Sequence, residues 1–169
     1  MKYMICSHAR SGKDNAAEFI HEKTGLSFLG SSFFAAEEFI YDTLKEEYGY
    51  TSVENCFSRR YEPGMRVIWY NLIAEYNKED PIRLVKNIFA SSDVYVGLRS
   101  YYEMEAAKKY YGNEIICIWI DAEGRVPDES ADSMTITKEQ ADIIIENKQG
   151  VEEFNAKLEK LCNLIGSKK

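Results

Sequence analysis

The run Ile115–Ile120, Ile-Ile-Cys-Ile-Trp-Ile, contains no polar side chain and is the feature that most constrains the fold. The run is far too short to span a bilayer, because a membrane-spanning helix takes about 20 apolar residues. A strand with apolar side chains on both faces is typical of a parallel sheet that helices cover on both sides. The run therefore predicts an α/β fold with this strand inside the sheet.

Strand-like and helix-like segments alternate along the rest of the chain. Further strands are expected at 3–6, 26–29, 93–96 and 143–145, and helices at 13–25, 33–48, 65–76, 80–89, 100–111 and 151–165. This alternation predicts a three-layer fold with an about five-stranded parallel sheet between helices. Ligands of such folds bind beyond the carboxyl ends of the strands, so the segments that directly follow strands are the candidates for a site.

The length and composition fit one globular domain over residues 1–166, with a short tail at 167–169. A helical insertion is expected at about 33–90 and a polar, lid-like connection at about 121–141. Lys and Arg number 21 against 28 Asp and Glu, and the net charge of −7 argues against nucleic acid or an anionic membrane as a partner. The four scattered cysteines, without a C-x-x-C pair, are expected to be buried thiols of a cytoplasmic protein.

A phosphate-loop pattern lies between the first predicted strand and the helix that follows it. The frame Ser7-x-x-x-x-Gly12-Lys13-Asp14 keeps the Gly-Lys pair of G-x-x-x-x-G-K-[ST], in which backbone amides and a lysine bind phosphates. Ser7 replaces the first glycine, and Asp14 replaces the hydroxyl residue. A Gly-Lys pair can also open an ordinary helix. Its position at a strand-to-helix junction, where the helix N-terminus attracts anions, favours a phosphate site.

At this loop the sequence resembles a known family. Arg10-Ser11-Gly12-Lys13-Asp14 is similar to the R-S-G-K-D phosphate loop of bacteriophage deoxynucleoside monophosphate kinases, and a K-S-G-K-D loop occurs in animal-type phosphomevalonate kinases. The segment 97–107 resembles the family's D-x-R-x-x-x-E-x-x-A segment, 116–125 its strand and basic lid, and 141–147 its closing D-x-x-I-x-N strand. The resemblance implies a P-loop kinase that transfers a phosphoryl group from ATP, with Mg²⁺, to a nucleoside monophosphate in a host cytoplasm. It leaves a homodimer open.

The resemblance and the placement of charges together give the candidate site residues. The candidates for binding ATP are Ser7, His8, Ala9, Arg10, Ser11, Gly12, Lys13, Asp14, Asn15, Arg125 and Asn147. The candidates for binding the acceptor are Arg59, Arg60, Arg66, Arg99 and Glu103. Lys13, Arg99 and Arg10 are the candidates for catalysis, because phosphoryl transfer needs positive charge around the transferred group. Asp14 is the candidate Mg²⁺ ligand.

Plain structural roles remain open beside these functional ones. Arg10 and Arg125 could be exposed loop arginines. Arg99 and Glu103 could form an ion pair, or Glu103 could be the acid of a capping box that begins at Ser100.

Two positions depart from the family pattern. Asn15 stands where the family has a hydroxyl residue, and Gly97 stands where it has an aspartate. The second departure bears on turnover more than on nucleotide binding. Two alternatives to a nucleoside monophosphate kinase therefore stay open: a kinase for another small phosphorylated acceptor, and a catalytically weak nucleotide-binding module that regulates a partner.

Overall fold

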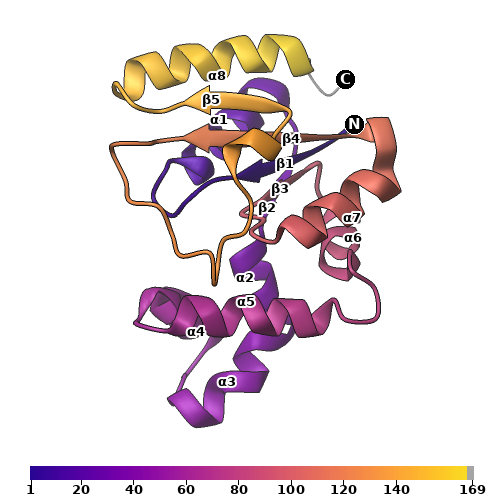
Figure 1. The fold of residues 1–169 in the computed structure, drawn as a ribbon, viewed down its shortest axis with the longest axis vertical. Coiled ribbons are helices and arrows are strands. Elements are labelled where there is room, and N and C mark those ends of the chain that lie inside the picture. The colour runs from indigo at the N-terminus through magenta and orange to yellow at the C-terminus, as the bar shows by residue number, and fades with distance from the viewer. Residues whose placement is uncertain (167–169) are drawn as a thin grey trace.

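The computed structural model describes residues 1–166, and the predicted tail at 167–169 lies outside this part. Its centre is a sheet of five parallel strands in the order β2-β3-β1-β4-β5 (Figure 1). The strands are β1 Lys2–Cys6, β2 Phe28–Gly30, β3 Val94–Val96, β4 Ile115–Asp121 and β5 Ile143–Glu146. The predicted α/β fold with a five-stranded parallel sheet is confirmed. The second strand begins two residues later than its apolar run suggested.

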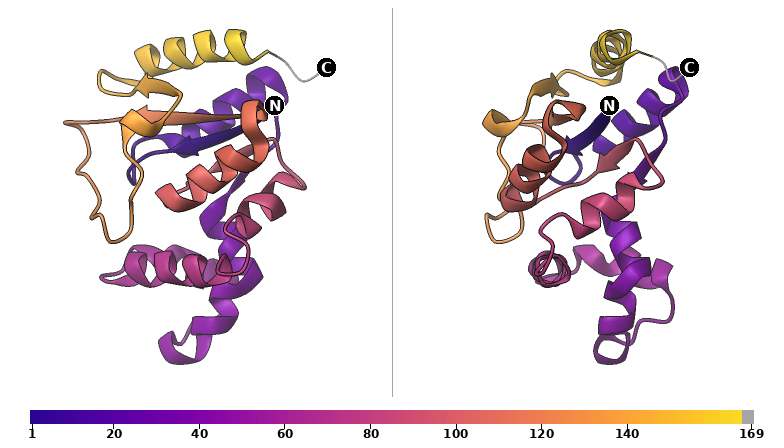
Figure 2. Two further views of the ribbon diagram at one scale, coloured as in Figure 1. Left: turned by 45° about the vertical axis from the view of Figure 1, so that its right-hand side comes forward. Right: turned by 90° about the vertical axis from the view of Figure 1, so that its right-hand side faces the viewer.

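The sheet separates two apolar cores, because side chains on a strand alternate between its faces. On β1, Tyr3 and Ile5 pack with α1 (Lys13–Thr24) and α8 (Val151–Ile165). Met4 and Cys6 face the other way, toward α6 (Arg83–Phe89) and α7 (Tyr101–Tyr111). Figure 2 shows these helix pairs on opposite sides of the strands.

A helical region lies beyond the sheet, in the lower part of Figure 1. It consists of α2 Ser31–Ala35, a π-helical segment Ala36–Ile40, α3 Tyr41–Tyr48, α4 Val53–Ser58, a 3₁₀ turn Arg59–Tyr61 and α5 Met65–Tyr76. The helix predicted at 33–48 therefore begins at Ser31 and contains a π-helical turn. The region has its own apolar cluster around Ile40, Cys56 and Trp69.

One helix begins later than predicted, and another begins as predicted but without a capping box. The helix expected to open at Asp80 begins at Arg83, because the Asn77 side-chain oxygen accepts a hydrogen bond from the Leu84 amide at 3.0 Å and caps the chain there. Ser100 does cap α7, accepting from the Glu103 amide at 3.3 Å. The Glu103 side chain does not complete a capping box and points elsewhere.

The remaining short elements are 3₁₀ turns at Gly112–Glu114 and Lys138–Gln140. The four cysteines are buried free thiols, as predicted. Within residues 1–166, no helix combines the length and the apolar character that crossing a membrane requires.

Candidate nucleotide and acceptor site

The loop Ser7–Gly12 connects the carboxyl end of β1 to the N-terminus of α1. Gly12 begins the helix with a left-handed backbone, φ 96° and ψ 19°, and no side chain caps the helix there. The first-turn amides of an α-helix have no partner inside the helix. At α1 they are left for an external anion, which the positive end of the helix dipole also attracts.

Asn147 and Arg125 hold the backbone of this loop. The Asn147 amide donates to the Ser11 carbonyl at 2.8 Å. The Arg125 guanidinium donates to the same carbonyl at 3.3 Å and to the Asn147 carbonyl at 3.0 Å. A Cβ on Gly12 would lie 2.7 Å from the Asn147 side-chain nitrogen, so this close approach requires glycine. Both residues predicted to contact ATP therefore lie at the loop, where they support its shape.

The structure also places three other residues that were predicted to bind ATP. The Ser7 hydroxyl donates to the His8 carbonyl at 3.0 Å. Nδ1 of His8 accepts from the Glu129 amide at 3.0 Å, and its Nε2 lies 3.3 Å from an Asp128 carboxylate oxygen. Asn15 is exposed on the first turn of α1.

Beside the loop, four cations from separate segments line one small hollow of about 110 Å³. They are Lys13, Arg60, Arg66 and Arg99, and Asp14 is the one carboxylate among the lining residues. We call this feature the anion hollow. Burial and the neighbouring charge of Arg99 together lower the pKa of Arg66 to about 10. Burial and mutual repulsion disfavour the charged forms of such neighbouring cations, so a site that holds them together is suited to a ligand with several negative oxygens.

A carboxylate from the predicted lid lies against the anion hollow and against the loop Ser7–Gly12. Glu129 Oε2 accepts from the Ala9 amide at 2.7 Å, and Oε1 accepts from Arg99 at 2.9 Å. The Arg66 Nε lies 3.8 Å from Oε1. Burial alone would raise the pKa of Glu129, but Arg99, the Ala9 amide and Arg66 lower it below its usual value. A carboxylate thus binds where a backbone amide and two guanidinium groups converge, as a phosphate would.

Tyr61 is a residue of this region that the sequence analysis missed. Its ring packs against the guanidinium groups of Arg66, at 4.2 Å, and Arg60, at 4.3 Å from its centroid. Burial alone would raise the pKa of Tyr61, but Arg60, Arg66 and Lys13 together lower it. The direction of this shift reports the positive potential at the hollow.

Other predicted site residues lie apart from the hollow. Arg59 donates to Glu62 at 2.8 Å and to the Tyr48 carbonyl at 3.1 Å, and it does not line the hollow. Arg10 is exposed, with a left-handed φ of 62°, and its guanidinium lies 5.9 Å from the Tyr61 ring. The ion pair between Arg99 and Glu103 is absent from the described residues, since Arg99 binds Glu129 and the Ser133 carbonyl instead.

The side chains at the hollow fit a magnesium ion only as part of a nucleotide complex. Within residues 1–166, no group of three or more His, Cys, Asp or Glu side chains could hold a metal ion. Mg²⁺ usually keeps several waters and takes one or two carboxylates together with substrate phosphates. The Asp14 carboxylate, 71% exposed beside Lys13, fits as the single protein ligand of such an ion.

Comparison with known proteins places the fold among small-molecule kinases. The structure is similar to dephospho-CoA kinase from Campylobacter jejuni, with a TM-score of 0.52, 17% identity and 98% of both chains covered. It is similar to shikimate kinase from Bacteroides thetaiotaomicron, with a TM-score of 0.50, 12% identity and 98% of both chains covered.

A third similar structure is the Mycobacterium tuberculosis APS kinase in complex with AMPPNP and APS, with a TM-score of 0.51, 13% identity, 97% of this chain and 96% of that chain covered. No protein-family model and no curated protein sequence matches the chain. The chain thus has the fold of P-loop small-molecule kinases.

Proposed function

We propose that the chain is an ATP-dependent kinase that transfers the terminal phosphoryl group of ATP to a (deoxy)nucleoside monophosphate. The observation that carries this proposal is the convergence of Lys13, Arg60, Arg66 and Arg99 on one hollow beside the loop that opens α1. In a protein of net charge −7, such a cationic cluster is suited to the negative oxygens of two phosphate-bearing substrates. The P-loop kinase fold supports the same reaction class.

In this reaction an oxygen of the acceptor phosphate forms a bond to the terminal phosphorus of ATP, and the bond from that phosphorus to the bridging oxygen breaks. The products are ADP and a nucleoside diphosphate. Lys13 and the first-turn amides of α1 would bind the ATP phosphates. Arg66 and Arg99 would bind the acceptor phosphate and stabilise the charge on the transferred group. Magnesium bound with ATP would neutralise phosphate charge, with Asp14 as its protein ligand.

The absence of a suitable base in the described part of the hollow favours a phosphate acceptor over an alcohol. A hydroxyl acceptor must lose a proton, whereas a phosphate oxygen is already ionised near neutral pH. Asp14 lies 3.4 Å from the Lys13 ammonium, and Arg99 and the Ala9 amide bind Glu129, so both carboxylates already have partners in this structure. At the carboxyl end of β3 the chain has Gly97, which carries no side chain.

A coupled assay of ADP release tests this function. Nucleoside monophosphates would be offered as acceptors, with and without Mg²⁺, beside the alcohols shikimate and gluconate. ADP formation that depends on a monophosphate supports the proposal, whereas ADP formation with an alcohol alone contradicts it. ATP binding without acceptor-dependent ADP would favour the alternative of a nucleotide-binding regulatory module. Glu129 at the anion hollow is the observation that keeps this alternative open.

A further inference from the structure

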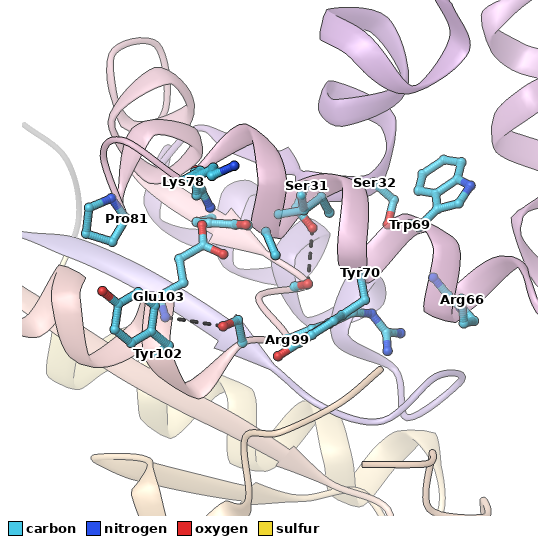
Figure 3. Close-up of a pocket in the computed structure, with 16 residues that line it drawn as sticks. Ser31, Ser32, Arg66, Trp69, Tyr70, Lys78, Pro81, Arg99, Tyr102 and Glu103 are labelled. Atoms are coloured by element: carbon cyan, nitrogen blue, oxygen red, sulfur yellow. Dashed lines mark hydrogen bonds between the residues drawn. The ribbon is translucent and has the colours of Figure 1, made fainter. Parts of the chain in front are cut away.

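A larger cavity of about 240 Å³ adjoins the anion hollow, and we call it the side cavity. Arg66, Gly97 and Arg99 line both. Figure 3 shows Arg66 and Arg99 on one side of the cavity and Glu103 on the other, with Tyr70 between them. A molecule whose phosphate lies at the two arginines would place the rest of its body in this cavity. This inference therefore rests on the proposed function.

Glu103 is the buried carboxyl group among the residues that line the side cavity. Glu103 is only 3% exposed, and its Oε1 atom has no hydrogen-bond partner. A buried polar atom without a partner costs about 1–3 kcal/mol, so the fold carries a deficit that a ligand can remove. The carboxyl group extends from α7 into the cavity (Figure 3).

The surroundings of Glu103 determine what kind of hydrogen bond Oε1 offers. Burial raises the pKa of Glu103 to about 8, although hydrogen bonds from Asn77 and Tyr95 lower it. The Asn77 oxygen is already bound to the Leu84 amide, so Asn77 presents its NH₂ group to the carboxyl. Oε1 is the carboxyl oxygen without a hydrogen-bond partner, so the neutral acid can carry its proton there without breaking an existing contact. The cavity therefore presents a hydrogen-bond donor.

The other walls of the side cavity fit a flat ring. Trp69, Tyr70 and Tyr102 line it together with Ile73 and Pro81. Aromatic side chains pack well against planar groups. The volume also lies below the roughly 300 Å³ at which drug-sized ligand pockets begin, so it suits one small ring system.

We propose that Glu103 is the specificity-determining residue of this cavity, where its Oε1 hydroxyl donates a hydrogen bond to a carbonyl oxygen or an unprotonated ring nitrogen of the acceptor's base. The acceptor is then a phosphomonoester that carries a planar, acceptor-bearing heterocycle. Glu103 acts on binding of the acceptor, since it faces the cavity and not the phosphate end.

The donor should be lost when Glu103 ionises, so acceptor binding should weaken above about pH 8. The titratable groups that face Glu103 are Tyr95 on β3 and Cys6 on β1, and burial raises the pKa of both well above their ordinary values. The other titratable or charged groups that line the cavity are Arg66, Tyr70, Lys78, Arg99 and Tyr102. The acceptor phosphate, with a second pKa near 6, is fully ionised above pH 7 and should not produce this change.

The experiment compares the wild-type chain with Glu103→Ala, Glu103→Gln and the control Glu105→Ala, an exposed carboxylate on the same helix. Binding of each nucleoside monophosphate and of the base-free deoxyribose 5-phosphate is measured by calorimetry, and KM and kcat by ADP release, between pH 7 and 9. Glu103→Ala should weaken nucleotide binding about tenfold and leave deoxyribose 5-phosphate unaffected. Glu103→Gln, which keeps a donor, should bind like the wild type but without the weakening at high pH.

The outcomes separate this inference from the proposed function. ADP formation with equal acceptor KM in the wild type and Glu103→Ala overturns the inference and leaves the function standing. Nucleotide binding that depends on Glu103, without ADP formation, supports the inference and contradicts the function. Failure of the wild type to bind any nucleoside monophosphate overturns both. If Glu103→Ala does not fold, a pH profile of Glu103→Gln that matches the wild type refutes the inference.

Discussion

Replacing Glu129 with glutamine should increase the affinity of the chain for ATP. The carboxylate accepts from the Ala9 amide at 2.7 Å and from Arg99 at 2.9 Å, and both donors face the region where phosphate oxygens are expected. A phosphate can use these donors only after the carboxylate has left them. Glutamine keeps the length of the side chain but removes its charge, so it competes less well than glutamate against a phosphate for these two donors.

The size of the effect follows from the two hydrogen bonds. A hydrogen bond to a charged group contributes about 1.5–3 kcal/mol net, and displacement of Glu129 costs at least one such bond. If the glutamine side chain does not compete with the ATP phosphates at all, the ATP affinity of the variant rises by about 10- to 150-fold. The same change leaves Arg66 and Arg99 without a counter-charge, so the variant should melt at a lower temperature until sulfate or phosphate is added.

Calorimetry with ATP and with tripolyphosphate measures the affinity, and thermal melts with and without sulfate measure the stability. Asp132→Asn is the matched control, because Asp132 is an exposed carboxylate in the same segment and its loss removes the same charge. An ATP affinity that is unchanged or lower in Glu129→Gln, relative to this control, would refute the reasoning that Glu129 occupies a phosphate position.

Three further changes test the site. Lys13→Met should lower kcat by about 10²- to 10³-fold in the ADP-release assay, because it removes a cation from the reacting phosphates. Gly12→Ala should lose ATP affinity and melt at a lower temperature than Gly25→Ala, because both glycines have positive φ but only the new Cβ at Gly12 would meet Asn147, at 2.7 Å. Glu103→Gln should remove a pH dependence of stability. The pKa of Glu103 is about 8 in the folded chain, against an ordinary value of 4.5, so the unfolded chain binds fewer protons between these two pH values. The free energy of unfolding of the wild type should therefore fall by up to about 5 kcal/mol as the pH rises through this range, as measured by denaturant titrations.

The sheet was predictable from sequence because buried parallel strands leave a direct record in the apolar runs. The apolar run at 115–120 matches β4 closely, and the strand predicted at 93–96 matches β3 except for Asp93, since the positions on both faces of a buried strand must be apolar. The π-helical segment Ala36–Ile40 leaves no such record. A π-helical turn contains one residue more than an α-helical turn, so it shifts the apolar face of the helix. Packing against neighbouring segments determines where such a turn forms, and a single sequence does not show that packing.

The cationic cluster was predictable in kind but not residue by residue. Arg59, Arg60 and Arg66 were equivalent in the sequence, yet Arg59 pairs with Glu62 three residues later. That local acid is a signal that could have set Arg59 apart. Glu129 carried no such signal, because its contacts with Ala9 and Arg99 join parts of the chain that are far apart in sequence.

The backbone conformation and the close contacts at position 97 explain why the chain has glycine there. Its φ is +95°, and a Cβ there would lie 3.0 Å from the Ser31 hydroxyl and 3.5 Å from Lys13 Cε. The Ser31 hydroxyl donates to the Gly97 carbonyl at 3.1 Å, so a side chain would press on the contact that joins the ends of β2 and β3. An aspartate would also place a negative charge beside Lys13 inside the anion hollow. With no side chain at that position, the hollow stays cationic, which suits the proposed reaction, in which both substrates bring phosphate charge.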